Sequence, residues 1–132
     1  MLFVDSNVIL DVITADPNWS AWSATQLAQA LDAGPVLINA IVYAEIAFAS
    51  DAIEAVDAFL PQHLYSYRPI PREASFLAAM AHADYRQRGG QRSMILPDFL
   101  IGAHALLEST GLLTRDGSRY RHAFPGLRLI LP

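Results

Sequence analysis

Four carboxylate side chains stand in stretches of sequence that are otherwise apolar. They end or interrupt the segments LFVD, NAIVYAEIAFA, LPDFLIGAHALL and LLTRD, and they are Asp5, Glu45, Asp98 and Asp116. A carboxylate in such a setting is expected to be buried, and a buried charge is costly unless it is paired or binds a metal. The chain has no lysine to pair with them. If the fold gathers all four, a divalent cation is the simplest compensation.

A cluster of four carboxylates is suited to bind a hard divalent cation. Mg²⁺ and Mn²⁺ prefer carboxylate oxygens and water to nitrogen or sulfur. Two carboxylates about 5 Å apart repel each other by roughly 3 kcal/mol at an effective dielectric constant of about 20, and a bound cation removes this repulsion. We therefore expect Asp98→Asn to stabilise the metal-free protein. A cation held in this way can activate water and neutralise a phosphodiester, so the pattern predicts a metal-dependent enzyme.

Each acidic residue also has a structural interpretation when it is taken alone. Asp5 can end a strand, Asp98 suits the first turn of any helix, and Asp116 in Arg-Asp-Gly suits a turn. Glu45 is harder to explain, because an unpaired glutamate is rarely buried. The four together favour a functional site more strongly than any one of them.

Composition fits a single domain over residues 1–132. Hydrophobic residues make up 53% of the chain and the mean hydropathy is +0.26, so we expect a partner or second subunit to cover part of the apolar surface. Neither a membrane span nor a signal peptide is expected, because polar groups interrupt every long apolar stretch. Cysteine is absent, which excludes disulfides and thiolate metal sites. We expect a cytoplasmic protein.

Charge is segregated along the chain, whose formal net charge is −4. Residues 1–67 contain no arginine, and all nine arginines follow. Arginines beside a metal site can hold a phosphate chain, because the guanidinium group matches phosphate geometry. The candidates for RNA phosphate contacts are Arg86, Arg88, Arg92 and Arg115. The alternative for each of them is an ordinary solvated surface arginine.

Apolar runs and helical periodicity alternate along the chain. The predicted strands cover 2–5, 35–39, 111–114 and 127–131, with a loop or short strand at 64–70. The predicted helices cover 7–15, 19–33, 40–50, 51–60, 72–88 and 97–109. Asn7 is a plausible N-cap for the first helix, and Gly34 a stop for the second. The alternation predicts an α/β fold with a parallel sheet and helices on both faces.

This arrangement brings the four acids toward one edge of the sheet. Sites in parallel α/β proteins form beyond the carboxyl ends of the strands, where Asp5 and Asp116 lie, and Asp98 opens a helix. Glu45 lies in the middle of its helix in line with Phe48, on a face that we expect to pack inward.

The segments DSNVILDVI, YAEI, LPDFLIGAHA and LLTRD followed by FPGLRLI together resemble the PIN domain, particularly VapC-type toxins of bacterial toxin–antitoxin pairs. The resemblance covers essentially the whole chain. It implies a three-layer α/β/α sandwich with a central parallel sheet, and an endoribonuclease that depends on Mg²⁺ or Mn²⁺. The catalytic and metal-binding residues that it implies are Asp5, Glu45, Asp98 and Asp116. Asn7 and Thr114 match the polar residues of the family that orient carboxylates or a bound water.

The resemblance also implies an RNA substrate, a homodimer and a small antitoxin protein that occupies the acidic groove. The main alternative is a non-catalytic module of the same fold that acts through a protein partner, although an intact set of four acids argues against it. A phosphotransfer protein is disfavoured, because receiver domains need a lysine. An aspartyl phosphatase would carry a second aspartate where this chain has Asn7.

Other polar residues near these motifs have structural interpretations. We expect Asp11 and Asp84 to be solvated or to pair locally, and His104 to be a core residue with its hydrogen bonds satisfied. Gly102 is expected to allow close helix packing near the site.

Overall fold

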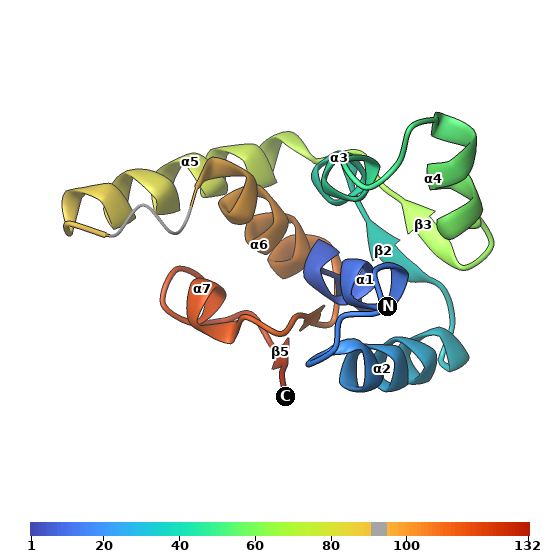
Figure 1. The fold of residues 1–132 in the computed structure, drawn as a ribbon. Coiled ribbons are helices and arrows are strands. Elements are labelled where there is room, and N and C mark those ends of the chain that lie inside the picture. The colour runs from blue at the N-terminus through green and yellow to red at the C-terminus, as the bar shows by residue number, and fades with distance from the viewer. Residues whose placement is uncertain (91–94) are drawn as a thin grey trace.

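Five short parallel strands form one sheet in the computed structural model, which describes residues 1–90 and 95–132 (Figure 1). The strands are β1 (Phe3–Val4), β2 (Val36–Ile38), β3 (Tyr65–Tyr67), β4 (Leu112–Leu113) and β5 (Leu129–Ile130). Their order in the sheet is β3-β2-β1-β4-β5. The predicted parallel sheet is confirmed, and the segment 64–70 contributes a strand to it.

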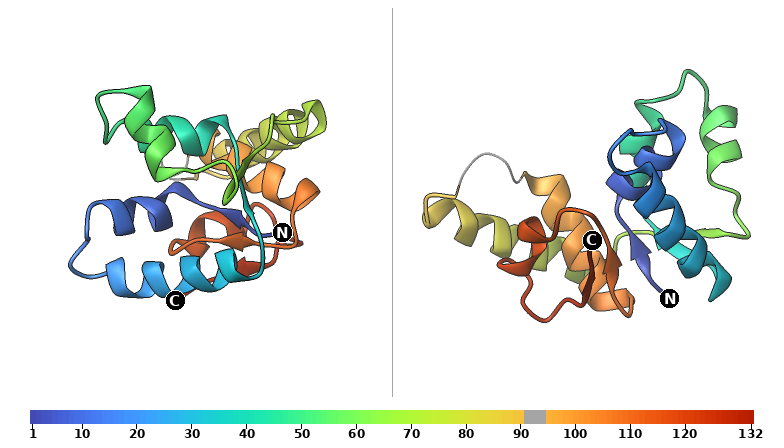
Figure 2. Two further views of the ribbon diagram at one scale, coloured as in Figure 1. Left: turned by 90° about the vertical axis from the view of Figure 1, so that its right-hand side faces the viewer. Right: turned by 60° about the horizontal axis from the view of Figure 1, so that its bottom comes forward.

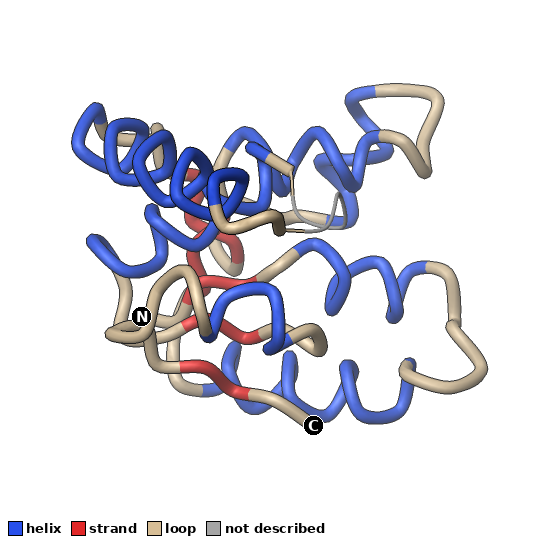
Figure 3. Tube along the Cα trace, turned by 90° about the vertical axis from the view of Figure 1, so that its left-hand side faces the viewer, coloured by secondary structure: helices blue, strands red, loops and turns tan. Residues whose placement is uncertain are grey.

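Helices cover both sides of this sheet. They are α1 (Ser6–Ile13), α2 (Ser20–Asp32), α3 (Ala40–Ala47), α4 (Ile53–Phe59), α5 (Arg72–Gln87), α6 (Leu96–Glu108) and α7 (Gly117–Arg121). The right-hand view of Figure 2 shows α5, α6 and α7 gathered on one side and α1 to α4 on the other. In Figure 3 the strands are stacked in a column, with helices on either side of it. This is the expected α/β/α sandwich.

The central strands are buried on both faces, which explains why their sequences are continuously apolar. Phe3 pairs with Leu37 of β2 on one side and with Leu112 of β4 on the other. All three side chains are buried. The chain order therefore reverses at β1, and the switch point of such a sheet is where ligands bind in open α/β folds. Asp5 follows β1 directly, and Thr114 follows β4.

The predicted start of the first helix is wrong, and one helix has no counterpart in the prediction. Helix α1 begins one residue before Asn7, and its N-cap residue is Asp5, whose backbone is extended. Helix α7 was not predicted, because five residues are too few to show helical periodicity and the Gly-Ser pair at its start is typical of a turn. Gly34 lies just beyond α2 with φ +136°, a conformation that favours glycine and agrees with the predicted helix end.

The expectation that the face of α3 with Glu45 and Phe48 packs inward is wrong at Phe48. Val42 and Ile46 carry the buried face of this helix, whereas Phe48, at its C-terminal end, is 93% exposed. Glu45 is half-buried between these extremes. The Glu45 side chain lines the cavity described below. The rest of the helix face that it shares with Phe48 is not buried. None of the described helices is long and apolar enough to cross a membrane.

Candidate active site

One cavity of about 250 Å³ lies beyond the carboxyl ends of β1 and β4. The residues that line it are Asp5, Ser6, Asn7, Leu10, Glu45, Asp98, Arg115, Asp116 and Arg119. All four predicted acids are among them. The strand ends and three helices, α1, α3 and α6, thus bring together carboxylates that are far apart in the sequence.

Asp5 is fixed by neutral hydrogen-bond donors. Its Oδ2 accepts hydrogen bonds from the hydroxyls of Tyr120 at 2.8 Å and Thr114 at 2.9 Å, and from the Asn7 amide at 3.5 Å. Only 5% of Asp5 is exposed. Burial raises the pKa of Asp5 and the charge of Asp98 adds to this, although the hydrogen bonds oppose the shift.

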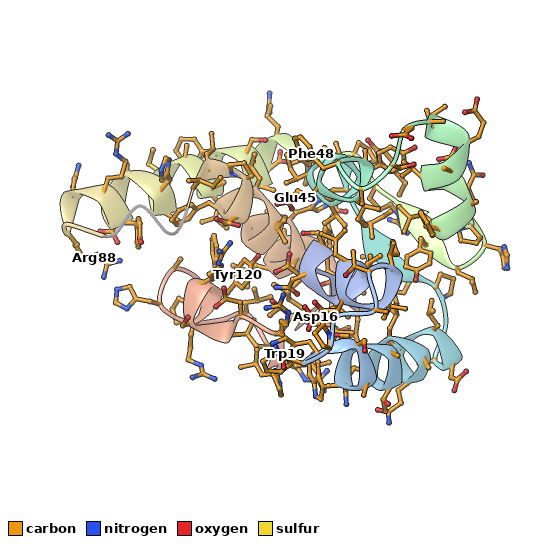
Figure 4. The ribbon with its side chains drawn as sticks, viewed as in Figure 1. Asp16, Trp19, Glu45, Phe48, Arg88 and Tyr120 are labelled. Carbon is orange, nitrogen blue, oxygen red and sulfur yellow. The ribbon has the colours of Figure 1, made fainter. Side chains whose placement is uncertain are left out.

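Glu45 reaches the cavity from α3. Its Oε1 accepts a hydrogen bond from the Ser6 hydroxyl at 2.9 Å. Helix α3 is in turn held at its start by Asn39, whose side chain accepts from the backbone N–H groups of residues 41 and 42. Burial raises the pKa of Glu45, and repulsion from Asp5 and Asp98 raises it further. In Figure 4, Glu45 lies beside α3 and Tyr120 lies beside α7.

Asp98 both starts a helix and lines the cavity. Its Oδ2 accepts from the backbone N–H of Ile95 at 2.9 Å, which caps α6. Its Oδ1 accepts from Nη1 of Arg119 at 2.8 Å. The side chain is almost fully buried, so the sequence segment LPD places a carboxylate inside the protein by making it part of a helix cap.

Asp116 shares this arginine with Asp98. Its Oδ2 lies 2.7 Å from Nε of Arg119, and its Oδ1 accepts from the Ser118 hydroxyl. Asp98 and Asp116 therefore have a cationic partner, and the expectation of four unpaired carboxylates is wrong because it considered lysine alone. Burial lowers the pKa of Arg119, but the two carboxylates raise it more. The basis for expecting Asp98→Asn to stabilise the protein is thereby removed.

The cavity fits a hard divalent cation in donor type and in charge. Carboxylate oxygens are the ligands that such ions prefer. Four carboxylates and only two arginines line the cavity, so negative charge is in excess. In the arrangement seen in residues 1–90 and 95–132, no three acidic or histidine side chains are grouped closely enough to hold an ion. Two of the carboxylates are instead held by the guanidinium.

A model of the PIN domain family matches residues 2–125. The chain belongs to the PIN domain family. No curated protein matches the sequence significantly. Proteins with the PIN domain are generally nucleases, and the four acids that the resemblance implies as site residues line the cavity.

Solved structures share the fold of this PIN domain at low sequence identity. The chain is similar to VapBC2 from Rickettsia felis bound to a promoter DNA fragment, with TM-score 0.73, 20% identity and coverage of 99% of this chain and 98% of that chain. The chain is also similar to VapBC-1 from nontypeable Haemophilus influenzae, with TM-score 0.72, 20% identity and coverage of 98% of this chain and 97% of that chain. A toxin–antitoxin complex from Klebsiella pneumoniae is similar as well, with TM-score 0.67, 19% identity and coverage of 98% of this chain and 96% of that chain.

The PIN domain buries a second ion pair beside the cavity. Asp11 is 3% exposed and accepts hydrogen bonds from Nε of Arg115 and from the Ser23 hydroxyl, both at 2.8 Å. The guanidinium of Arg115 also lies 5.6 Å from the centre of the Trp19 ring. The expectation for Asp11 is wrong, because it is buried and its ion-pair partner is 104 residues away. Arg115 lines the cavity while it holds this pair.

The remaining candidate arginines lie away from the cavity or outside the described residues. Arg88 forms an exposed ion pair with Asp84 at 2.7 Å, which confirms the local pairing expected for Asp84. Figure 4 shows Arg88 at the far end of α5 from Glu45. Arg86 is exposed on the same helix end. Arg92 lies outside the described residues, and contact of this region with RNA stays a prediction.

Four residues of the site were missed by the sequence reasoning: Ser6, Asp11, Arg119 and Tyr120. Arg119 follows Asp116 by three residues, a spacing that allows pairing on a helix, but the helix itself was not predicted. Tyr120 carried no signal, because its contact with Asp5 spans 115 positions.

Two structural predictions near the site are confirmed. His104 is fully buried and bonded to Asn39 and Glu108, each at 3.1 Å. A Cβ atom on Gly102 would lie 2.4 Å from the Phe124 ring, so α6 packs closely there.

Proposed function

We propose that the chain is a Mg²⁺- or Mn²⁺-dependent endoribonuclease that hydrolyses RNA phosphodiester bonds and acts as the toxin of a cytoplasmic toxin–antitoxin pair. One observation carries the proposal: Asp5, Glu45, Asp98 and Asp116 come from four separate segments of a PIN domain and line one cavity. Excess negative charge in the cavity destabilises the folded state, and a bound cation would neutralise that charge.

The proposed chemistry assigns a task to each group. The four carboxylates would hold the cation, which would stabilise negative charge on the phosphodiester and lower the pKa of a water molecule so that it can attack phosphorus. Tyr120 and Thr114 keep Asp5 in one orientation through its Oδ2. Ser6 orients Glu45. Glu45 lies on the cavity wall, where it would complete the set of carboxylates around the cation.

Arginines of the C-terminal half are proposed to hold the RNA. Arg115 binds Asp11 through Nε and lines the cavity, so its two terminal amino groups are available for a phosphate oxygen. Arg86, Arg88 and Arg92 are proposed to contact flanking phosphates of the RNA strand.

Cleavage of RNA by the purified chain, with Mg²⁺ or Mn²⁺ and with EDTA, tests this function. We expect EDTA to abolish cleavage and both Asp5→Asn and Asp98→Asn to reduce its rate at least about a hundredfold, since each removes a carboxylate charge from the cavity. Asp32→Asn is the matched control, because Asp32 is exposed at the end of α2 and does not line the cavity. Cleavage that persists in EDTA or in both cavity variants contradicts the proposal. Absence of cleavage although metal binds favours the non-catalytic module.

The proposed partners are a small antitoxin protein and a second copy of the chain. The solved complex from Klebsiella pneumoniae is a toxin–antitoxin complex of similar fold. Apolar side chains project from α5, where Phe76 is 68% and Met80 51% exposed, one helical turn apart. Light scattering of the 14.5 kDa chain should give twice this mass, and a monomer contradicts the dimer. Co-purification with the small protein encoded by a neighbouring reading frame tests the antitoxin.

A further inference from the structure

Arg119 bridges two of the four carboxylates of the proposed metal site. Nη1 donates to Oδ1 of Asp98 at 2.8 Å and Nε donates to Oδ2 of Asp116 at 2.7 Å. A guanidinium has only donors and cannot itself bind a metal ion. An oxygen that it holds is therefore less available to a cation, because two positive charges at one oxygen repel each other.

Asp98 has little freedom to serve both partners. Its Oδ2 caps α6 by accepting from the Ile95 N–H, and this bond keeps the start of the helix closed. Oδ1 is consequently the oxygen that can turn to a metal ion, and it is the one that Arg119 binds. The guanidinium and a divalent cation therefore compete for the same atom.

The position of Arg119 allows it to leave. Its side chain is 39% exposed and belongs to the short helix α7. Arg115, the other arginine of the cavity, differs because it is held by the buried carboxylate of Asp11 and lies against Trp19. Of these two cations, Arg119 is the one that can exchange with a metal.

We propose that Arg119 is an internal counter-ion that competes with the divalent cation for Asp98 and Asp116. It stabilises the metal-free site, and metal binding requires it to release Oδ1 of Asp98. Arg119 thereby lowers the affinity of the site for metal. This inference rests on the proposed metal-dependent function.

Titration calorimetry with Mn²⁺ tests the competition without any RNA. We expect Arg119→Gln to bind Mn²⁺ roughly two- to thirtyfold more tightly than the unmodified protein, the range that corresponds to loss of two partly exposed ion pairs. Arg119→Lys keeps the charge but loses the planar fork, so its affinity should lie between the two. Arg121→Gln is the matched control, because Arg121 is exposed on the same helix. An affinity for Mn²⁺ that is equal or weaker in Arg119→Gln overturns the inference.

Thermal unfolding separates this role from a merely structural one. In EDTA, Arg119→Gln should unfold at a lower temperature than the unmodified protein, because Asp98 and Asp116 lose their cation. In saturating Mn²⁺ the difference should close or reverse, since ligand binding to the folded state adds stability according to affinity. A difference in unfolding temperature that is the same in EDTA and in Mn²⁺ means that Arg119 is structural only, and overturns the inference.

The RNA cleavage assay distinguishes failure of the inference from failure of the function. Tighter Mn²⁺ binding by Arg119→Gln without cleavage by the unmodified protein supports the inference and contradicts the nuclease. RNA cleavage by the unmodified protein, together with equal Mn²⁺ affinities of that protein and Arg119→Gln, supports the nuclease and contradicts the inference. Absence of Mn²⁺ binding in both proteins overturns both.

Discussion

Asp5 and Asp98 are almost equally buried, with 5% and 4% of their surface exposed, but their charges are stabilised differently. Asp98 is held by the Arg119 cation, whereas the side chains bonded to Asp5 are neutral donors, with Tyr120 and Thr114 the closest. Neutral donors oppose but do not cancel the effect of burial, which raises the pKa of Asp5. The two aspartates should therefore respond in opposite ways to loss of their charge.

We predict that Asp5→Asn raises the free energy of unfolding in EDTA and that Asp98→Asn lowers it by about 1–2 kcal/mol. The first change removes a buried charge without a cation, and the second removes a charge-assisted hydrogen bond to a partly exposed arginine. Urea unfolding of both variants at neutral pH measures the two effects. A loss of stability in Asp5→Asn, or a gain in Asp98→Asn, contradicts this account of the cavity.

The same reasoning predicts how the stability difference depends on pH. The folded-state pKa of Asp5 lies above its ordinary value of 3.8, so the folded protein keeps this proton at pH values where the unfolded chain has lost it. Ionisation of Asp5 therefore lowers the free energy of unfolding of the metal-free protein as pH rises from 3.8 through the raised pKa. At higher pH this contribution stays constant. The advantage of Asp5→Asn over the unmodified protein should grow across that window and then level off. An advantage that shrinks as pH rises has the wrong sign.

At the scale of elements, close packing between α6 and the segment that follows β4 fixes the site. Gly102 on α6 lies against Phe124 and Tyr120, where an added Cβ would meet ring atoms at 2.4 Å and 3.0 Å. Both rings are buried, and Tyr120 is the residue that bonds Asp5. A change at Gly102 therefore reaches the acidic cavity through one side chain.

We predict that Gly102→Ala destabilises the protein by about 1–3 kcal/mol, because overpacking against a buried ring outweighs the better helix propensity of alanine. It should also weaken RNA cleavage, since Tyr120 must move. Gly126→Ala is the control, because the nearest atom to its added Cβ is 3.7 Å away. Circular dichroism during thermal unfolding compares the two variants. Equal unfolding temperatures for both contradict the packing described here.

Elements with a repeated pattern could be predicted from the sequence, and those without one could not. The apolar run before Asp5 predicted β1, and the Pro97 signal predicted the start of α6 to within one residue. Helix α7 has five residues and a turn-like start, so it showed no pattern, although it carries Arg119. The segment of β3 is compatible with a loop or a short strand, because prolines bound it.

At the scale of the whole molecule, the convergence of Asp5 and Asp116 followed from the order of strands and helices alone. Any parallel sheet places the ends of its strands together, so Asp5 and Asp116 could be placed without knowledge of side chains. The partners of these carboxylates could not, because they depend on contacts between distant positions. The pair of Asp11 and Arg115, 104 residues apart, is one example. The sequence therefore predicts where charge gathers but not how it is balanced.

The location of Mn²⁺ in crystals grown with this ion tests the central claim most directly. The account predicts an anomalous scattering peak in the cavity, with carboxylate oxygens of Asp5 and Asp98 about 2.0–2.3 Å from it and with Arg119 turned away from Oδ1 of Asp98. A cavity without such a peak at saturating Mn²⁺, or a peak bound only by carboxylates elsewhere on the surface, contradicts it.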